Sequence, residues 1–221
     1  MEKIEDDLPT RLIEGYKAFF YSRLRHERER YEKLAAEGQT PEIMIVSCCD
    51  SRAAPETVFD AAPGEIFVVR NVANLVPPFQ PDGVYHGTSA ALEFGVQQLQ
   101  VRHILVMGHG RCGGVHAFRA QMEGRPPQPL SAGDFIGKWI SLLEPAAHDM
   151  DCASDAEPAV RQRALEEASV RNSLGNLMTF PNIRTQVEKG ALHLHGAWFD
   201  ISTGELWFLD RQSRNFRRSP V

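Results

Sequence analysis

Three short apolar runs constrain the fold of this chain more than any other feature of its sequence. They are IMIVSC at 43–48, EIFVV at 65–69 and HILVM at 103–107. Continuous apolar runs of this length are typical of strands buried on both faces of a parallel sheet. Because parallel neighbours need a crossover, usually a helix, the runs predict an α/β fold with a central, mainly parallel sheet flanked by helices.

Helix-like segments separate these runs and follow them. A short helix is predicted at 53–61, and a longer one at 88–100 begins with Thr88 as its N-cap and carries Leu92, Val96 and Leu99 on one face. Polar character between 146 and 157 predicts a loop. Further helices are predicted up to about Glu123, at 134–143, at 158–179 and at 181–189.

The two ends of the chain complete the expected fold. LHLHGAWFD at 192–200 and ELWFLD at 205–210 flank a turn at 202–204, which predicts a hairpin with an antiparallel edge strand near the C-terminus. Near the N-terminus, apolar residues from Leu12 to Leu24 recur at helical spacing, and a nearly all-charged stretch follows at 25–33. This pattern predicts a long helix ending near residue 36, with an apolar stripe that needs a covering partner.

Composition limits the class of protein. The 221 residues are 43% hydrophobic and 24% charged, values typical of a single globular domain. The net charge of −5, with no basic stretch rich in aromatic residues, argues against nucleic-acid binding. No apolar run approaches the roughly 18 residues of a membrane span, and the N-terminus lacks the pattern of a signal peptide. We therefore expect a cytoplasmic protein whose four cysteines are thiols or metal ligands.

The loop GHGRCGG at 108–114 has two interpretations. Its glycines match G-x-G-x-x-G after a strand, the pattern of a dinucleotide-binding loop. Such a site also expects a strand that ends in an acidic residue about 20 residues further on. That region here is QMEGRPPQPLSAGD, which is not a strand pattern. The alternative is a metal site. CCDSR at 48–52 also leaves a strand at its carboxyl end, and neighbouring parallel strands would bring the two loops together. Two thiolates and an imidazole around zinc leave one position open, as in catalytic sites.

Four segments together resemble the β-class carbonic anhydrases. They are SCCDSR (47–52), FVVRNVANLVPP (67–78), GTSAALEFGV (87–96) and GHGRCGG (108–114), within a resemblance that covers roughly residues 35–120. The resemblance implies one Zn²⁺ per subunit, held by Cys48, His109 and Cys112. It also implies a homodimer or tetramer, in which a helical arm at 1–36 of the single 1–221 domain packs on a partner subunit.

The resemblance further implies a carbonate dehydratase that hydrates CO2 reversibly to bicarbonate and a proton, by attack of a zinc-bound hydroxide. Asp50 would orient that hydroxide, and Arg52 would hold Asp50 ionised by a bidentate pair. In some family members the equivalent aspartate binds zinc instead, so Asp50 is also a candidate fourth ligand in a closed, inactive state. Because two thiolates neutralise Zn²⁺, we expect activity to rise through the alkaline range.

The pocket wall indicates a subclass. Gln39 and Phe67 match the plant-like members, and Ile45 stands where the other subclass has a tryptophan of a noncatalytic bicarbonate site. An open zinc site without that inhibitory site is therefore expected. The remaining substrate-binding candidates implied by the resemblance are Val72, Phe94 and Gly113, although Phe94 replaces a tyrosine of plant-like members and equally suits core packing.

Some alternatives stay open at this point. The same zinc site suits hydrolysis of CS2 or COS, and a noncatalytic zinc module that binds a partner belongs to a second class. His193 and His195 share one face of a predicted strand, as a metal pair or as packed histidines. Proton relay through Tyr85 and His86 is a further possibility. Cys49 and Cys152 receive no role.

Overall fold

The computed structural model describes residues 8–81, 85–125, 128–129, 132–150 and 155–220. The chain divides into two units, Met1–Gln39 and Thr40–Val221, and each is considered by itself. None of the helices in the described part of the chain has the length and apolar character that a membrane crossing requires.

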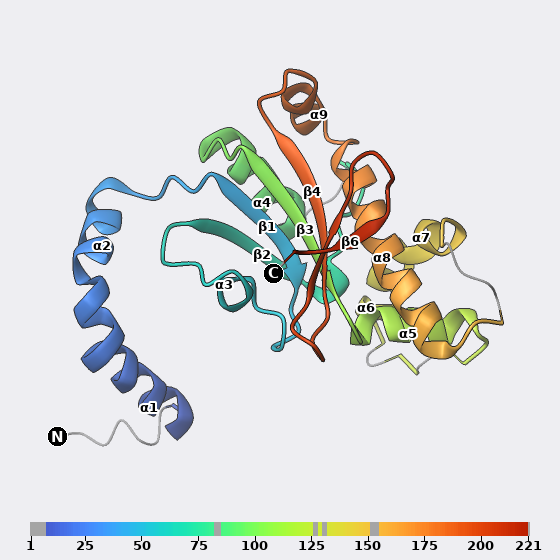
Figure 1. The fold of residues 1–221 in the computed structure, drawn as a ribbon, viewed down its shortest axis with the longest axis horizontal. Helices are drawn as coiled ribbons and strands as arrows, with labels where there is room; N and C mark the ends of the chain where they lie inside the picture. Colours follow the sequence, from blue (N-terminus) through green and yellow to red (C-terminus); the bar gives the residue numbers. More distant parts are fainter. Residues whose placement is uncertain (1–7, 82–84, 126–127, 130–131, 151–154, 221) are drawn as a thin grey trace. The chain divides into compact units, whose positions relative to one another are not determined.

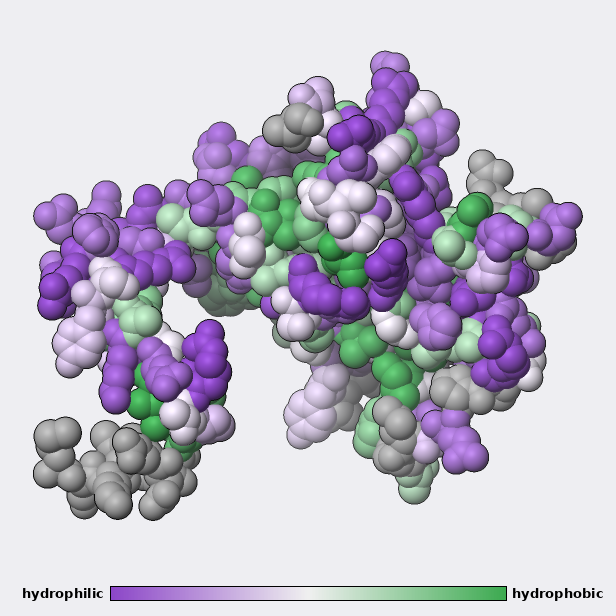
Figure 2. Space-filling model, turned by 60° about the horizontal axis from the view of Figure 1, so that its bottom comes forward, coloured by the Kyte–Doolittle hydropathy of each residue, from purple (hydrophilic) through white to green (hydrophobic). Residues whose placement is uncertain are grey.

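The first unit is one long helical arm, as predicted (Figure 1). It consists of α1 (Thr10–Ala18), the π-helical segment η2 (Phe19–Arg23) and α2 (Leu24–Glu37), and it ends at Gly38, whose φ of +81° suits glycine. Leu12 and Tyr16 are 60% and 62% exposed. Figure 2 shows hydrophobic side chains interrupting the otherwise hydrophilic surface of the arm. Within the described residues 8–39, Leu12 and Tyr16 of the apolar stripe therefore stay exposed.

The second unit is built on a six-stranded sheet with the order β2-β1-β3-β4-β5-β6 (Figure 1). Strands β1 to β4 are parallel, and β5 and β6 continue the sheet in antiparallel fashion. The predicted α/β fold with a mainly parallel sheet is thus confirmed. The strand bounds are β1 (Ile43–Cys48), β2 (Ile66–Asn71), β3 (His103–His109), β4 (His193–Phe199), β5 (Leu206–Leu209) and β6 (Phe216–Arg218).

Helices and short helical turns connect the strands and cover the sheet (Figure 1). The two longest beyond the arm are α8, which contacts β3 and β4, and α5, which packs on α8. The bounds are α3 (Pro55–Val58), η3 (Val72–Asn74), α4 (Gly87–Glu93), η4 (Phe94–Gln98), α5 (Gly113–Met122), α6 (Phe135–Ile140), η5 (Ser141–Leu143), α7 (Glu144–His148), α8 (Pro158–Leu177) and α9 (Pro181–Glu188).

Two buried clusters position the carboxyl ends of the strands. The larger joins the even-numbered side chains of β1 and β3, such as Met44 and Val106, to α4, α8 and α9. The second contains Cys48 and Cys112 together with side chains of α5, η5 and α8, among them Phe118, Leu143 and Leu165. Because these two cysteines belong to a packed core, their positions are set by the fold around them.

Three local predictions were wrong, each for a structural reason. Thr88 does not cap its helix, because its buried hydroxyl lies inside the first turn and accepts a hydrogen bond from Asn71. The predicted loop at 146–157 begins within α7, which is anchored by buried Ala146. Strand β3 continues two residues beyond the apolar run, to His109. The predicted hairpin of β4 and β5 and the antiparallel edge near the C-terminus are confirmed, and the edge strand itself is β6, which pairs outside β5.

Candidate metal centre

The fold brings the three predicted zinc ligands together. Cys48 is the last residue of β1, His109 is the last residue of the adjacent strand β3, and Cys112 directly precedes α5. All three are buried, and their donor atoms lie within 4.8 Å of one another. The two Sγ atoms are 4.0 Å apart. Thiolate and imidazole donors at such separations match the ligand types that zinc prefers.

The imidazole of His109 is oriented as a metal ligand would be. Its Nδ1 lies 2.9 Å from the carbonyl oxygen of Gly110 and therefore donates a hydrogen bond to it. This assigns the lone pair to Nε2, which is buried and has no hydrogen-bond partner. A buried nitrogen without a partner carries a desolvation cost that a cation would remove. The residues present therefore fit a zinc ion.

The contact between the two cysteines moves the pKa values of their thiols in opposite directions. A hydrogen bond with the Cys112 thiol lowers the pKa of Cys48 to about 4, and the same contact, with burial, raises the pKa of Cys112. A metal needs both sulfurs as thiolates, so its binding would displace the remaining proton. Zinc affinity at this centre therefore increases with pH.

The turn η3 supports the Cys48 sulfur from the side. The backbone N–H of Ala73 points at Cys48 Sγ, 3.4 Å away. Ala73 and Asn74 both have positive φ, +64° and +50°, a conformation that costs energy for residues other than glycine. Gly114 packs against this turn, because a Cβ there would lie 2.7 Å from Val72 Cγ1 and 3.1 Å from Ala73 Cβ. The strained turn and α5 thus fit together only with glycine at 114.

Asp50 and Arg52 form the predicted bidentate pair. Arg52 donates from Nε to Oδ1 at 2.9 Å and from Nη2 to Oδ2 at 2.7 Å, and its backbone N–H also donates to Oδ1. These hydrogen bonds hold the pKa of Asp50 well below its usual range, so the carboxylate stays ionised. Oδ2 also lies 3.9 Å from the unpartnered Nε2 of His109. An ionised acceptor therefore faces the place where the donors converge.

Two residues that the sequence analysis missed fasten the loops of the centre. Arg70 of β2 donates to the carbonyl oxygens of Cys48 at 2.8 Å and Asp50 at 2.7 Å. Glu166 of α8 is 2% exposed and accepts hydrogen bonds from the Cys112 N–H at 2.9 Å, the Trp198 indole at 3.0 Å and Gln162. For Arg70 the available signal was a charged residue at the end of the apolar run FVVRN, although it does not identify the partners; Glu166 lies beside Glu167 in a polar stretch that gives no such signal.

The five pocket candidates fall into three groups. Val72 and Gly113 lie at the centre, since Val72 contacts the start of α5 and Gly113 is its first residue. Phe67 and Phe94 pack on each other with ring centroids 5.9 Å apart. Phe67 pairs with Met44, four residues before Cys48, which is about 13 Å along the strand. Gln39 is the last residue of the first unit.

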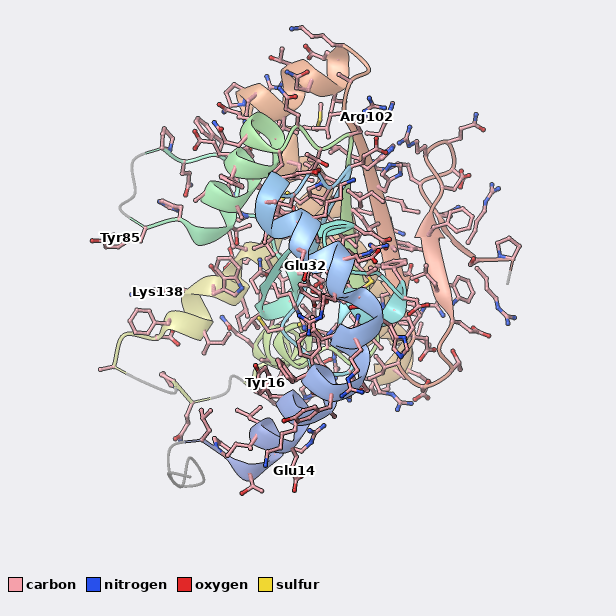
Figure 3. All side chains as sticks on the ribbon, turned by 90° about the vertical axis from the view of Figure 1, so that its left-hand side faces the viewer. Glu14, Tyr16, Glu32, Tyr85, Arg102 and Lys138 are labelled. Atoms are coloured by element: carbon pink, nitrogen blue, oxygen red, sulfur yellow. The ribbon has the colours of Figure 1, made fainter. Side chains whose placement is uncertain are left out.

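The remaining residues singled out in the sequence are not among the three donors. Tyr85 is 94% exposed and projects from a loop, as Figure 3 shows, and His86 follows it. His193 and His195 are at the amino end of β4, and Cys49 is an exposed free thiol. Cys152 lies outside the described residues.

The fold and the centre define a class: an α/β protein with a buried Cys–His–Cys zinc centre at the carboxyl ends of its strands, faced by an arginine-paired carboxylate. Such a centre leaves one position of a tetrahedral zinc free, which is the arrangement of catalytic rather than structural zinc sites.

Comparisons with known proteins agree with this class. A family model described as carbonic anhydrase matches residues 43–206. The chain is 35% identical over 209 residues to the chloroplastic β-carbonic anhydrase 5 of Arabidopsis thaliana, covering 93% of this chain and 65% of that protein's length. The solved β-carbonic anhydrase CcaA superposes with a TM-score of 0.84 at 28% identity, over 96% of this chain and 92% of that one.

A tetrameric β-carbonic anhydrase from the ascomycete Sordaria macrospora superposes with a TM-score of 0.73 at 28% identity, over 90% of this chain and 94% of that one. This chain belongs to the β-carbonic anhydrase family.

Proposed function

We propose that this protein is a carbonate dehydratase that catalyses the reversible hydration of CO2 to bicarbonate and a proton, with one Zn²⁺ per chain at Cys48, His109 and Cys112. The observation that carries the proposal is the ionised Asp50 carboxylate, whose Oδ2 lies 3.9 Å from the unpartnered His109 Nε2. A site that only stored zinc would need the three donors but no oriented acceptor beside them.

Zinc, when bound, supplies the Lewis acidity that lets water ionise near neutral pH and attack CO2. Asp50 accepts a hydrogen bond from that water and so fixes the direction of its lone pair. Arg52 keeps Asp50 ionised and in place. The amide of Ala73 donates to the Cys48 sulfur and reduces the charge that this thiolate transfers to the metal.

We propose that the site is open, with Asp50 outside the ligand set. Both carboxylate oxygens are held by Arg52, and Arg52 Nη2 also lies 3.4 Å from the carbonyl oxygen of Arg111. Asp50 would become a fourth ligand in a closed, inactive state only after these hydrogen bonds break. Protonation of Asp50 favours their loss, but its lowered pKa confines protonation to strongly acidic solution.

We also propose that the enzyme is a homodimer or tetramer with the arm of one chain on another. The exposed stripe of the arm supports an oligomer, and the Sordaria macrospora enzymes are tetrameric. The separation of Phe67 from Cys48 along the strands gives a further reason. In such an assembly Phe67 and Phe94 would act as the pocket wall of a neighbouring chain, while Val72 and Gly113 contact substrate from the same chain.

A cytoplasmic location is likewise a proposal. Its support is that Cys49, which is not among the proposed zinc ligands, is an exposed free thiol, as a reducing compartment would keep it. Fractionation of the native cells, with immunodetection of the protein, tests it.

Turnover of three gases by the purified zinc enzyme tests the proposed reaction. CO2 hydration should be fast, and hydrolysis of COS and CS2 should be slower by at least about 100-fold. Faster turnover of a sulfur gas than of CO2 would assign the site to hydrolysis of that gas. No turnover of any gas by protein with a full zinc complement would leave the noncatalytic zinc module.

A further inference from the structure

Three histidines gather at the amino ends of β3 and β4, away from the Cys–His–Cys centre. His103 begins β3 and pairs in register with His193, which begins β4, and His195 lies two residues further along β4. Arg102, labelled in Figure 3, directly precedes His103 and marks this end of the sheet. His109 is six residues away from His103 on the same strand, which is about 20 Å.

The ring of His103 contacts the rings of both other histidines. His103 Nδ1 and His195 Nε2 are 3.1 Å apart. The ring centroids of His103 and His193 are 5.4 Å apart in a stacked arrangement, and those of His103 and His195 are 5.2 Å apart. All three side chains are half-buried, so the cluster is shielded but still open to solvent.

The 3.1 Å between His103 Nδ1 and His195 Nε2 is also a distance expected between two nitrogen ligands of one cation. A metal–nitrogen bond of about 2.0–2.1 Å with tetrahedral or octahedral angles places neighbouring ligand nitrogens roughly 2.9–3.4 Å apart. A hydrogen bond between the same atoms requires one nitrogen to be protonated and the other not. A cation would instead use the lone pairs of both nitrogens, with His103 protonated at Nε2 and His195 protonated at Nδ1.

The charges around His195 are unfavourable to an imidazolium. Burial, the guanidinium of Arg211 and the neighbouring His103 and His193 lower the pKa of His195 to about 4. His195 is therefore neutral at physiological pH, which is the form that binds metals. Arg211 also donates to the Leu194 carbonyl oxygen at 3.4 Å, and its charge opposes any cation bound nearby.

We propose that His103 and His195, with His193 beside them, form a second metal site that takes a borderline divalent cation of the Zn²⁺ type and ties β3 to β4. Two imidazoles are the donor type that such cations favour, and solvent completes the coordination. The site is separate from the catalytic centre and does not depend on the reaction proposed above.

Zinc binding to the holoenzyme tests the site. The protein, loaded with one zinc per chain, is titrated calorimetrically with Zn²⁺ near pH 7.5, and bound zinc is counted after equilibrium dialysis. One further zinc per chain is expected. H195Q and H103Q should each weaken this second binding event by about 10-fold or more, with the first zinc retained. H148Q, which changes a histidine on α7, serves as the matched control and should bind both ions.

The variant Arg211→Gln provides a second test, which does not depend on whether the histidine variants fold. Arg211 is exposed, and removal of its charge should tighten the second binding event several-fold. The proposal is overturned if the holoenzyme binds no second zinc, if H195Q and H103Q bind it as tightly as H148Q, or if R211Q leaves its affinity unchanged.

Discussion

At the scale of single residues, the proposed chemistry depends on the carboxylate of Asp50 and on Arg52, which holds it. Asp50 follows β1 by two residues, and three hydrogen bonds from Arg52 hold its carboxylate and keep it ionised. The pair is partly exposed, so it adds little to stability and its value lies in orientation. Arg70 completes the arrangement by fixing the backbone on both sides of Cys49.

Replacement of Asp50 by asparagine tests this role. The amide side chain has nearly the same shape as the carboxylate but is a weaker acceptor, so kcat for CO2 hydration should fall about 100-fold or more. Because the pKa of Asp50 is lowered, the carboxylate is ionised at every pH above its ordinary value of 3.8, and the loss should be the same at pH 6.5 and 9. Stopped-flow assays at both values, with zinc content measured on the same samples, provide the readout.

The exposed Asp155, changed to asparagine, is the matched control and should keep full activity. An Asp50→Asn enzyme with unchanged turnover and full zinc would remove Asp50 from the mechanism.

At the scale of elements, the centre is assembled where two strands, one turn and two helices end or meet. β1 and β3 deliver Cys48 and His109, η3 supplies an amide to the sulfur, and α5 begins at the second cysteine. Glu166 of α8 then joins the Cys112 amide to Trp198 of β4. The position of each ligand therefore depends on contacts between elements that are far apart in sequence.

The contact between η3 and α5 predicts different effects for two adjacent glycines. Gly114→Ala places a Cβ against Val72 and Ala73, so it should destabilise the fold by about 1–3 kcal/mol and weaken zinc retention. Gly113→Ala meets no atom within 4 Å and should leave both properties unchanged. Urea denaturation and dialysis against a chelator measure the two effects. Equal behaviour of the two variants would contradict the packing described for this turn.

The buried Glu166 predicts a second effect between elements. Glu166 accepts hydrogen bonds from three donors. An ionised carboxylate can accept all three, but an amide cannot, because the amide nitrogen is itself a donor. Glu166→Gln should therefore cost about 1–3 kcal/mol of unfolding free energy. Glu167→Gln, which changes the neighbour paired with Arg163 and Arg171, should cost less than about 1 kcal/mol. Chemical denaturation of both variants decides whether the buried carboxylate has this structural role.

The sequence alone predicted the parallel strands and the convergence of their polar ends, because buried strands have a strong local pattern and the direction of a parallel sheet brings its carboxyl ends together. It did not predict Arg70, Glu166 or the positive φ of Ala73. These features depend on partners far along the chain or on backbone conformation, neither of which a residue pattern encodes. Strand β6 was missed for a similar reason, since FRR has no apolar alternation and pairs only because β5 offers an edge.

At the scale of the whole molecule, the arm and the second unit raise the question of assembly. The arm exposes Leu12 and Tyr16 along α1, a helix that contains no buried residue and on which Figure 3 labels Tyr16 and Glu14. An apolar stripe of this kind is costly in water and is expected to be covered by another chain.

Charged substitutions on the stripe should reduce the size of the assembly. The double variant Leu12→Asp and Tyr16→Asp removes apolar contacts and places two charges in the expected interface, so its sedimentation coefficient should fall below that of the unaltered protein. Glu14→Gln on the same helix is the control. Analytical ultracentrifugation of all three proteins measures the effect, and identical sedimentation of the double variant and the unaltered protein would show that the stripe is not an interface.

The central claim is that zinc at Cys48, His109 and Cys112 makes this protein a CO2 hydrase. The most direct measurement is stopped-flow CO2 hydration by metal-free protein that is titrated with zinc, from about pH 6.5 to 9. The rate should rise in proportion to bound zinc up to one ion per chain, and kcat should increase with pH across this range. A rate no greater than that of buffer at every pH, with one zinc bound per chain, would contradict the claim.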